Sequence, residues 1–168
     1  MSDDDLIAAR VTKLAALLEA RGLKLTCAES CTGGWLAKCL TDRAGSSAWF
    51  EFGFVTYGNN AKQKLLGVRA ATLDAHGAVS QQAAEAMATG ARRVSGADLA
   101  VAITGIAGPA GGTASKPVGT VWFAWAGPDG VLGAERRVFS GVGPGDRAAI
   151  RSQAVAAALD GTIARLHH

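Results

Sequence analysis

Apolar residues along this chain repeat with two different periods, which separates stretches typical of helices from stretches typical of strands. After Ser2 and the acidic residues that follow it, hydrophobic positions recur every three or four residues from Leu6 to Leu18. Gly22 then follows as a natural end of the helix. This spacing predicts an amphipathic first helix. Further helices are predicted over 35–43, 61–66, 72–76 and 81–94 and from about 146 onward, and strands over 23–27, 49–57, 98–103, 118–126 and 131–139.

The order of these elements predicts the class of fold. Helices alternate with strands over most of the chain, and the last two strands are joined by Gly-Pro-Asp-Gly at 127–130, which is strong turn chemistry. A connection this short implies an antiparallel pair. The alternation predicts an α/β fold in which helices cover both faces of a mixed sheet, within a single domain over residues 1–168. In such sheets, ligands bind beyond the carboxyl ends of the strands.

The composition is that of a globular protein and argues against several functional classes. Hydrophobic residues make up 49% of the chain and charged residues 18%, with no apolar run long enough to span a membrane. The net charge is only +3 and the basic residues are scattered, so no nucleic-acid partner is expected. An acidic N-terminus and an odd number of cysteines, at 27, 31 and 39, favour the cytoplasm. The spacing of Cys and His suits no metal site.

The predicted site is organised around Thr26–Gly34, which connects a strand to a helix. This stretch holds Ser30 among other small hydroxyl and thiol side chains, and it ends in two glycines followed by the free N–H groups of a helix start. Ser30 is the candidate nucleophile, and Cys31 is its rival. The simpler alternative is that Ser30 or Thr32 only caps the helix. The run matches neither the G-x-S-x-G nucleophile elbow nor a Walker loop.

A base for this serine has to come from elsewhere in the chain. Histidine is scarce, with only His76 in the body of the sequence, whereas Lys62 falls in the first turn of a helix, five residues after Tyr57. A neutral lysine can accept the proton of a serine hydroxyl. Lowering its pKa from about 10.4 to roughly 7–8 costs about 4 kcal/mol, most of which must come from burial. We therefore predict that Lys62 is buried and Lys64 exposed; the alternative is that Lys62 is an ordinary solvated lysine.

Two later segments are candidates for contacts with a ligand. Thr104–Thr113 follows a predicted buried strand and is rich in glycine, so that its backbone N–H groups can approach a ligand closely; a plain flexible connection is the alternative. Its spacing is not that of a dinucleotide-binding loop. Arg147 opens the last helix directly after Asp146, where it can reach a phosphate, help to hold the Ser30 corner, or serve only as a surface charge.

Five motifs together resemble the CinA C-terminal domain family, and the match runs through nearly the whole chain. The motifs are Ala28–Gly34 (AESCTGG), Phe54–Tyr57 (FVTY) with Lys62, His76–Ser80 (HGAVS), Thr104–Pro109 (TGIAGP) and Lys116–Val121 (KPVGTV). Gly145-Asp146-Arg147 also matches a Gly-Asp-Arg segment of the family. The resemblance implies a three-layer α/β/α fold, whose mixed, mostly parallel five-stranded sheet contains one antiparallel strand.

Enzymatic members of this family are nicotinamide-nucleotide amidases, so the resemblance implies hydrolysis of nicotinamide mononucleotide to nicotinic acid mononucleotide and ammonia. It implies Ser30 as the nucleophile, Lys62 as the base and Tyr57 as a supporting catalytic residue, without a metal or a cofactor. We expect a small-molecule mononucleotide as partner and a homo-oligomer, a dimer. The positions expected to contact the substrate are Cys31, Thr32, Gly33, Gly34, Thr104, Gly105, Gly108 and Arg147.

Two other functions remain open from the sequence. One is a binding module that keeps the pocket without turnover, such as an accessory protein for nucleotide sensing or DNA repair. The other is an amidase that acts on a different small amide.

Overall fold

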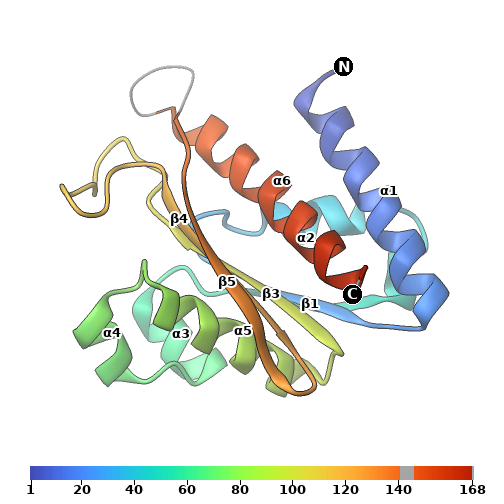
Figure 1. The fold of residues 1–168 in the computed structure, drawn as a ribbon, viewed down its shortest axis with the longest axis horizontal. Helices are drawn as coiled ribbons and strands as arrows, with labels where there is room; N and C mark the ends of the chain where they lie inside the picture. Colours follow the sequence, from blue (N-terminus) through green and yellow to red (C-terminus); the bar gives the residue numbers. More distant parts are fainter. Residues whose placement is uncertain (141–145, 168) are drawn as a thin grey trace.

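The computed structural model describes residues 1–140 and 146–167, and its centre is a five-stranded sheet (Figure 1). The strands are β1 (Leu25–Glu29), β2 (Phe50–Val55), β3 (Leu99–Gly105), β4 (Thr120–Gly127) and β5 (Gly130–Val138), in the spatial order β2-β1-β3-β4-β5. β1 is parallel to both β2 and β3, whereas β4 is antiparallel to β3 and to β5. Only β4 therefore runs against the other strands, which confirms the predicted mixed sheet.

Helices cover both faces of this sheet and complete the three layers. The helices are α1 (Asp3–Arg21), α2 (Trp35–Thr41), α3 (Asn59–Leu66), α4 (Ala70–His76), α5 (Gln81–Ser95) and α6 (Arg147–Leu166), with a short 3-10 turn at Ser46–Ala48. Figure 1 shows α1, α2 and α6 on one side of the sheet and α3, α4 and α5 on the other. Each side has its own apolar core, and the strands contribute side chains to both. Among the helices of the described residues, none has the length and apolarity needed to cross a membrane.

The central strands show why the sequence forms this sheet. Every residue of β1 is buried, and so is almost all of β3, because both strands have neighbours on either side and helices above and below. The edge strands β2 and β5 keep most of their residues exposed or half-buried. Mostly apolar residues form the enclosed strands, and a mixture of polar and apolar residues forms the strands that are exposed to solvent.

Two boundaries differ from the sequence prediction in ways that position the site. β1 starts two residues later than predicted and continues to Glu29, which is paired with Val55 of β2 and Ile103 of β3. Burial of a carboxylate is costly unless its hydrogen bonds are satisfied, and here the turn and the helix that follow satisfy them, as described below. Helix α3 starts at Asn59, two residues earlier than predicted. Ser30 thus lies directly beyond a strand, and Lys62 lies within the first turn or so of a helix.

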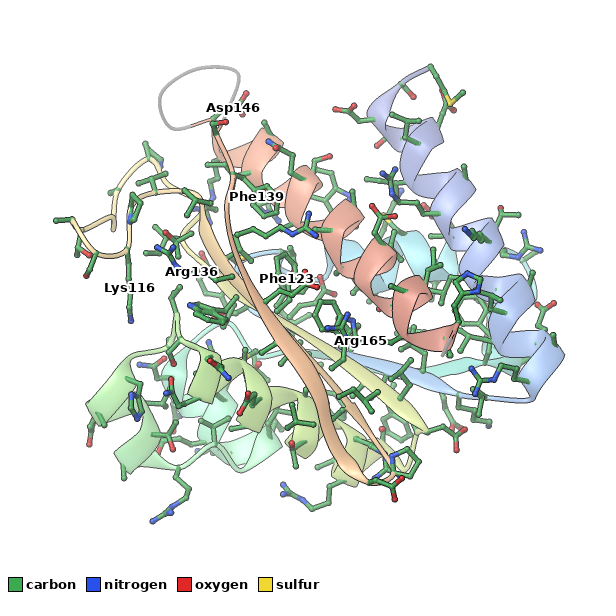
Figure 2. All side chains as sticks on the ribbon, viewed as in Figure 1. Lys116, Phe123, Arg136, Phe139, Asp146 and Arg165 are labelled. Atoms are coloured by element: carbon green, nitrogen blue, oxygen red, sulfur yellow. The ribbon has the colours of Figure 1, made fainter. Side chains whose placement is uncertain are left out.

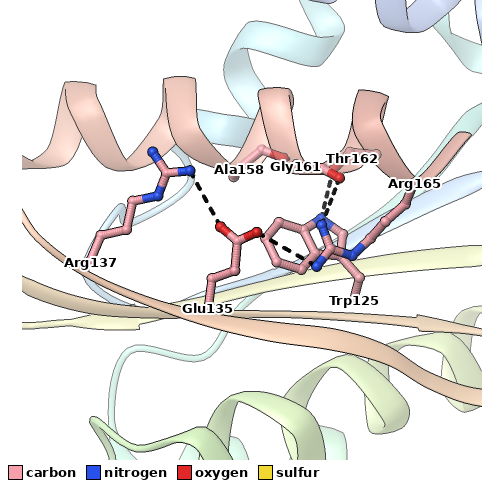
Figure 3. A network of polar contacts seen from close by, with 7 residues as sticks. All are labelled: Trp125, Glu135, Arg137, Ala158, Gly161, Thr162 and Arg165. Carbon is pink, nitrogen blue, oxygen red and sulfur yellow. Dashed lines mark hydrogen bonds and ion pairs between the residues drawn. The ribbon is translucent and has the colours of Figure 1, made fainter. Parts of the chain in front are cut away.

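A polar network fixes helix α6 against the last two strands (Figure 3). The indole Nε1 of Trp125 donates to Thr162 Oγ1 at 3.0 Å, and the guanidinium carbon of Arg165 lies 3.6 Å from the centre of the indole ring. Glu135 of β5 lies between two arginines, 3.3 Å from Arg137 and 3.8 Å from Arg165. This end of α6 is held to β4 and β5, and the other end of the same helix carries Arg147 and Arg151 to the candidate site.

Candidate active site

Ser30 and Lys62 meet at the carboxyl edge of the sheet. Ser30 follows β1, and Lys62 is on the helix that follows β2; because β1 and β2 are adjacent and parallel, both segments leave the sheet at the same edge. The Nζ atom of Lys62 lies 2.8 Å from the Oγ atom of Ser30. The structure therefore brings together the hydroxyl and the amine that the sequence analysis paired.

Burial changes the protonation of this lysine in the direction that we predicted. Lys62 is only 1% exposed, whereas Lys64 is exposed. Removal of the ammonium from water lowers the pKa of Lys62 from 10.5 to about 8. Within residues 1–140 and 146–167, no carboxylate lies within ion-pair distance of its Nζ atom to offset this effect. The alternative of a solvated helix lysine is wrong.

The hydrogen-bond partners of the amine can all be satisfied by its neutral form. Besides Ser30 Oγ, the Nζ atom contacts the backbone carbonyl oxygens of Thr56 at 2.8 Å and Tyr57 at 3.0 Å. A neutral amine has two N–H donors for the two carbonyls and one lone pair for the serine hydroxyl. Ser30 Oγ also lies 3.2 Å from the carbonyl of Tyr57, which is a second acceptor for the hydroxyl proton. The arrangement is therefore suited to proton transfer from Ser30 to Lys62.

Glu29 holds the turn that carries Ser30, a role that the sequence analysis missed. Its carboxylate is fully buried and accepts the hydroxyl of Thr32 at 2.6 Å and the backbone N–H groups of Leu36 at 2.8 Å and Ala37 at 3.0 Å. Glu29 therefore caps helix α2, whose N-cap position is occupied by Gly34 without a side-chain bond. The idea that Ser30 or Thr32 caps this helix is wrong. The signal in the sequence was an acidic residue at the end of an otherwise apolar strand.

Arg151 of helix α6 holds the same turn from the other side, and it too was missed. Its guanidinium donates from Nε to the carbonyl of Cys31 and from Nη2 to the carbonyl of Thr32, both at 3.1 Å. In a planar trans peptide the N–H points away from the C=O, so Arg151 also directs the N–H groups of Thr32 and Gly33 away from itself. Nothing in the local sequence of the turn indicates a contact with a residue about 120 positions later.

The N–H groups expected to stabilise an oxyanion are only partly available. We expected them around Thr32 to Gly34, but the N–H of Gly33 donates to the carbonyl of Ser30 at 3.0 Å. No acceptor on another described residue is assigned to the N–H groups of Cys31 and Thr32. The candidate oxyanion donors therefore shift toward the residues immediately after the serine.

A pocket of about 260 Å³ opens beside the serine–lysine pair. Of the predicted site residues, it is lined by Ser30, Cys31, Tyr57, Lys62, Thr104, Gly105, Gly108 and Arg147. Thr32, Gly33 and Gly34 are not among its lining residues: Thr32 is buried beneath the turn, and the two glycines adopt φ values of 57° and 99°, which the turn itself requires. The pocket thus combines the ends of several segments that are far apart in sequence.

Arg147 joins two walls of this pocket. Its guanidinium donates from Nη1 to the carbonyl of Gly108 and from Nη2 to the phenol oxygen of Tyr57, each at 2.8 Å. It is therefore more than a surface charge, and it holds the glycine-rich loop next to Tyr57, whose side chain is largely exposed. Gly145, the first residue of the Gly-Asp-Arg segment, lies outside the described residues.

The glycines of the 104–113 loop are explained mainly by packing. A Cβ atom at Gly105 would lie 2.7 Å from the Val121 side chain, and Gly108 has a φ of 76° and abuts Val118. Both glycines therefore let the loop lie close to the start of β4 as well as lining the pocket. Thr104 is buried and donates its hydroxyl to the carbonyl of Ala78 at 2.8 Å, which ties the loop to the turn before α5.

The other candidate nucleophile and the histidine are poorly placed. Burial raises the pKa of the Cys31 thiol to about 11, so the reactive thiolate is scarce at neutral pH. His76 is exposed and does not line the pocket of Ser30. Among the described residues, no three His, Cys, Asp or Glu side chains are grouped so that they can hold a metal. A larger hollow of about 370 Å³ lies between α1 and α2, and neither Ser30 nor Lys62 lines it.

The fold and the site define an α/β protein with a serine and a buried lysine in a pocket at the carboxyl edge of its sheet. The family model described as the CinA C-terminal domain matches residues 8–166. The chain belongs to this family.

Known relatives and solved structures agree with that assignment. The chain is 58% identical over 142 residues to a nicotinamide-nucleotide amidohydrolase PncC of Escherichia coli K12, covering 84% of each protein. It is 50% identical over 159 residues to a protein of the same name from Pseudomonas putida, covering 95% of this chain and 96% of the relative. A crystal structure of a CinA superfamily protein from Klebsiella pneumoniae superposes with a TM-score of 0.90 at 42% identity, covering 100% of this chain and 99% of that one.

Proposed function

We propose that this protein hydrolyses the carboxamide of nicotinamide mononucleotide to give nicotinic acid mononucleotide and ammonia. The observation that carries the proposal is the contact of 2.8 Å between Ser30 Oγ and the buried amine of Lys62, whose pKa is lowered to about 8, in the lining of a pocket. The relatives named nicotinamide-nucleotide amidohydrolase, at 50% and 58% identity over most of the chain, support this choice of amide.

The first half of the reaction forms an acyl-enzyme. Neutral Lys62 accepts the hydroxyl proton of Ser30 while Oγ attacks the carboxamide carbon. Negative charge develops on the carboxamide oxygen, and the N–H groups of Cys31 and Thr32 are the donors nearest in sequence to the nucleophile. When the intermediate collapses, the C–N bond breaks and the nitrogen takes up the proton held by Lys62, leaving as ammonia. Lys62 is then neutral again.

The second half returns the enzyme to its starting state. Lys62 removes a proton from water, the resulting hydroxide attacks the acyl carbon, and the bond to Ser30 Oγ breaks as Lys62 returns the proton to that oxygen. The product acid gives up its remaining proton to solvent and leaves as a carboxylate. Tyr57 accepts a hydrogen bond from Arg147, so its own phenol proton remains directed away from that arginine and available to the leaving nitrogen or to the substrate.

Ammonia release from nicotinamide mononucleotide tests this function directly. Wild type should release ammonia, Ser30→Ala should lose at least about 10³-fold in kcat, and Lys62→Met about 10²- to 10⁴-fold. Undiminished turnover by Ser30→Ala would remove the nucleophile from the mechanism. Lys64→Met is the matched control, because that lysine is exposed two positions away.

The same assay separates the two alternative functions. Binding of the mononucleotide without any ammonia release by the wild type would favour a binding module. Release from free nicotinamide or another small amide, but not from the mononucleotide, would favour an amidase of different specificity.

A further inference from the structure

A second groove lies beside the candidate active site and shares one wall with it. It has a volume of about 340 Å³, and Val79 lines both this groove and the pocket of Ser30. The loop before β4, the strands β4 and β5, and the start of α5 enclose it, contributing Lys116, Trp122, Arg136 and Gln81. The two cavities therefore adjoin at Val79.

Two cations converge on this groove without a carboxylate to neutralise them. Lys116 Nζ donates to the carbonyl of His76 at 2.8 Å, and Arg136 Nη2 donates to the carbonyl of Ser115 at 3.2 Å. Neither forms an ion pair with any acidic group of residues 1–140 and 146–167. The carbonyls orient the two side chains but leave their charges uncompensated, and each retains N–H donors for a ligand.

The sheet register places an aromatic ring next to these charges. Trp122 and Arg136 are directly opposite one another on β4 and β5, so both side chains project from the same face of the sheet. Figure 2 shows Lys116 extending from its loop toward the helical layer that contains α4, with Arg136 nearby. Of the described residues that line the groove, none is acidic. The surface is therefore suited to an anion joined to a less polar group.

The electrostatics of the active site give a reason to hold an anion at a distance. A phosphate beside Lys62 would favour its charged form and raise its pKa, which would remove the neutral base at neutral pH. Arg147, the other cation of the catalytic pocket, already donates to Gly108 and Tyr57. A substrate with both a carboxamide and a phosphate is best bound with the carboxamide at Ser30 and the phosphate outside this pocket.

We propose that the groove binds the phosphate end of the substrate, with Lys116 and Arg136 donating to the phosphate oxygens and the ribose passing Val79. This inference rests on the proposed function, because it assigns the second end of the same mononucleotide. It makes Lys116 and Arg136 specificity-determining residues that distinguish a nucleotide from its nucleoside.

The experiment compares nicotinamide mononucleotide with nicotinamide riboside, which lacks only the phosphate. Lys116→Gln and Arg136→Gln should each raise KM for the mononucleotide about 10-fold or more, with kcat nearly unchanged, because each removes a charge-assisted hydrogen bond. For the riboside, kcat/KM should change less than about twofold. Arg137→Gln is the matched control, since the adjacent residue on β5 lies on the opposite face and pairs with Glu135.

Equal losses for the mononucleotide and the riboside would overturn the proposal, because they would mean that the two cations act only on the fold. An unchanged KM for the mononucleotide in a variant that carries both Lys116→Gln and Arg136→Gln would overturn it as well. Calorimetric titration of the mononucleotide into Ser30→Ala, with and without Arg136→Gln, keeps this result separate from the amidase activity. If the wild type releases no ammonia but Ser30→Ala shows phosphate-dependent binding that Arg136→Gln weakens, the groove would be retained and the amidase rejected. Binding insensitive to Arg136→Gln would reject the groove.

Discussion

The amine of Lys62 and the hydroxyl of Ser30 lie 2.8 Å apart, although 32 positions separate them in the chain. Two adjacent parallel strands produce this contact, because each residue follows the carboxyl end of one of them. The carbonyls of Thr56 and Tyr57 hold the amine in place, and burial lowers its pKa so that a fraction of it is uncharged near neutral pH. The contact is therefore the centre of the proposed chemistry.

The pH dependence of activity follows from the protonation of Lys62. Only the neutral amine accepts a proton, and its pKa is lowered to about 8, so kcat/KM should rise with pH and level off above roughly pH 9. At pH 7 about a tenth of the molecules hold the neutral amine. Rates of ammonia release from pH 6 to 10 test this. A profile that is flat over this range would contradict the role of Lys62 as the base.

Lys62→Arg should be inactive over the whole of that pH range. A guanidinium stays protonated under these conditions and cannot act as the base. Lys64→Arg, a change of the same kind on an exposed side chain, should retain full activity.

Stability should depend on pH through the same lysine. Its pKa is lower in the folded protein, at about 8, than the 10.5 of a free lysine, so the unfolded chain binds the extra proton between these values. The contribution of Lys62 to the free energy of unfolding is therefore least favourable below pH 8 and should increase by about 3 kcal/mol as the pH rises from 8 to 10.5.

Chemical denaturation of wild type and Lys62→Met at several pH values measures this effect. The difference between the two free energies of unfolding cancels the titration of all other groups. A difference that stays constant from pH 7 to 10.5 would show that Lys62 is not perturbed in the folded state.

Arg151 should act on the rate through the turn that follows Ser30. Arg151→Met removes both hydrogen bonds to the carbonyls of Cys31 and Thr32, so the N–H of Thr32, one of the two proposed to stabilise the oxyanion, loses its fixed direction. We expect kcat to fall about tenfold or more with little change in KM. Arg151→Lys should restore little of the lost kcat, since an ammonium cannot reproduce the two parallel donors of the guanidinium.

Steady-state kinetics of these variants, with Arg69→Met as an exposed control, distinguish positioning from general damage. A rise in KM with kcat unchanged would assign Arg151 to substrate binding instead. A loss of kcat matched by reduced folded protein in circular dichroism would assign it to stability alone.

Gly161 should be intolerant of a side chain for reasons of packing. A Cβ atom at this position of α6 would lie against the ring of Trp125, with one ring carbon at 2.6 Å. Gly161→Ala should therefore lower the free energy of unfolding by about 1–3 kcal/mol as the helix is displaced from β4. Gly58→Ala, where no other heavy atom lies within 4 Å, should change it by less than about 1 kcal/mol. Thermal unfolding of both variants measures the two losses of stability. Equal losses would contradict the explanation that the Trp125 ring excludes a side chain at position 161.

Most of the helices and strands could be predicted from local patterns in the sequence. Apolar periodicity, helix-ending glycines such as Gly22 and the Gly-Pro-Asp-Gly turn at 127–130 predicted each helix and strand to within a few residues. Ser30 and Lys62 were identifiable because one lies among small residues before a helix and the other follows a strand with no histidine nearby to serve as base. These signals arise between residues that are close together in the chain, so they can be recognised from the sequence alone.

Contacts between distant segments were decided only by the tertiary structure. Locally, Glu29 is only a polar interruption of a strand; in the fold it accepts hydrogen bonds from Thr32 in the turn and from two N–H groups of helix α2. Arg151 is likewise one more helix arginine until α6 packs beside the Ser30 turn. The same holds for Lys116 and Arg136, which meet because a loop and an edge strand enclose one groove. The sequence by itself determined which segments form helices and strands and which groups can react. Their distances, their burial and the pKa of Lys62 depend on packing across the whole sheet, which no local pattern encodes.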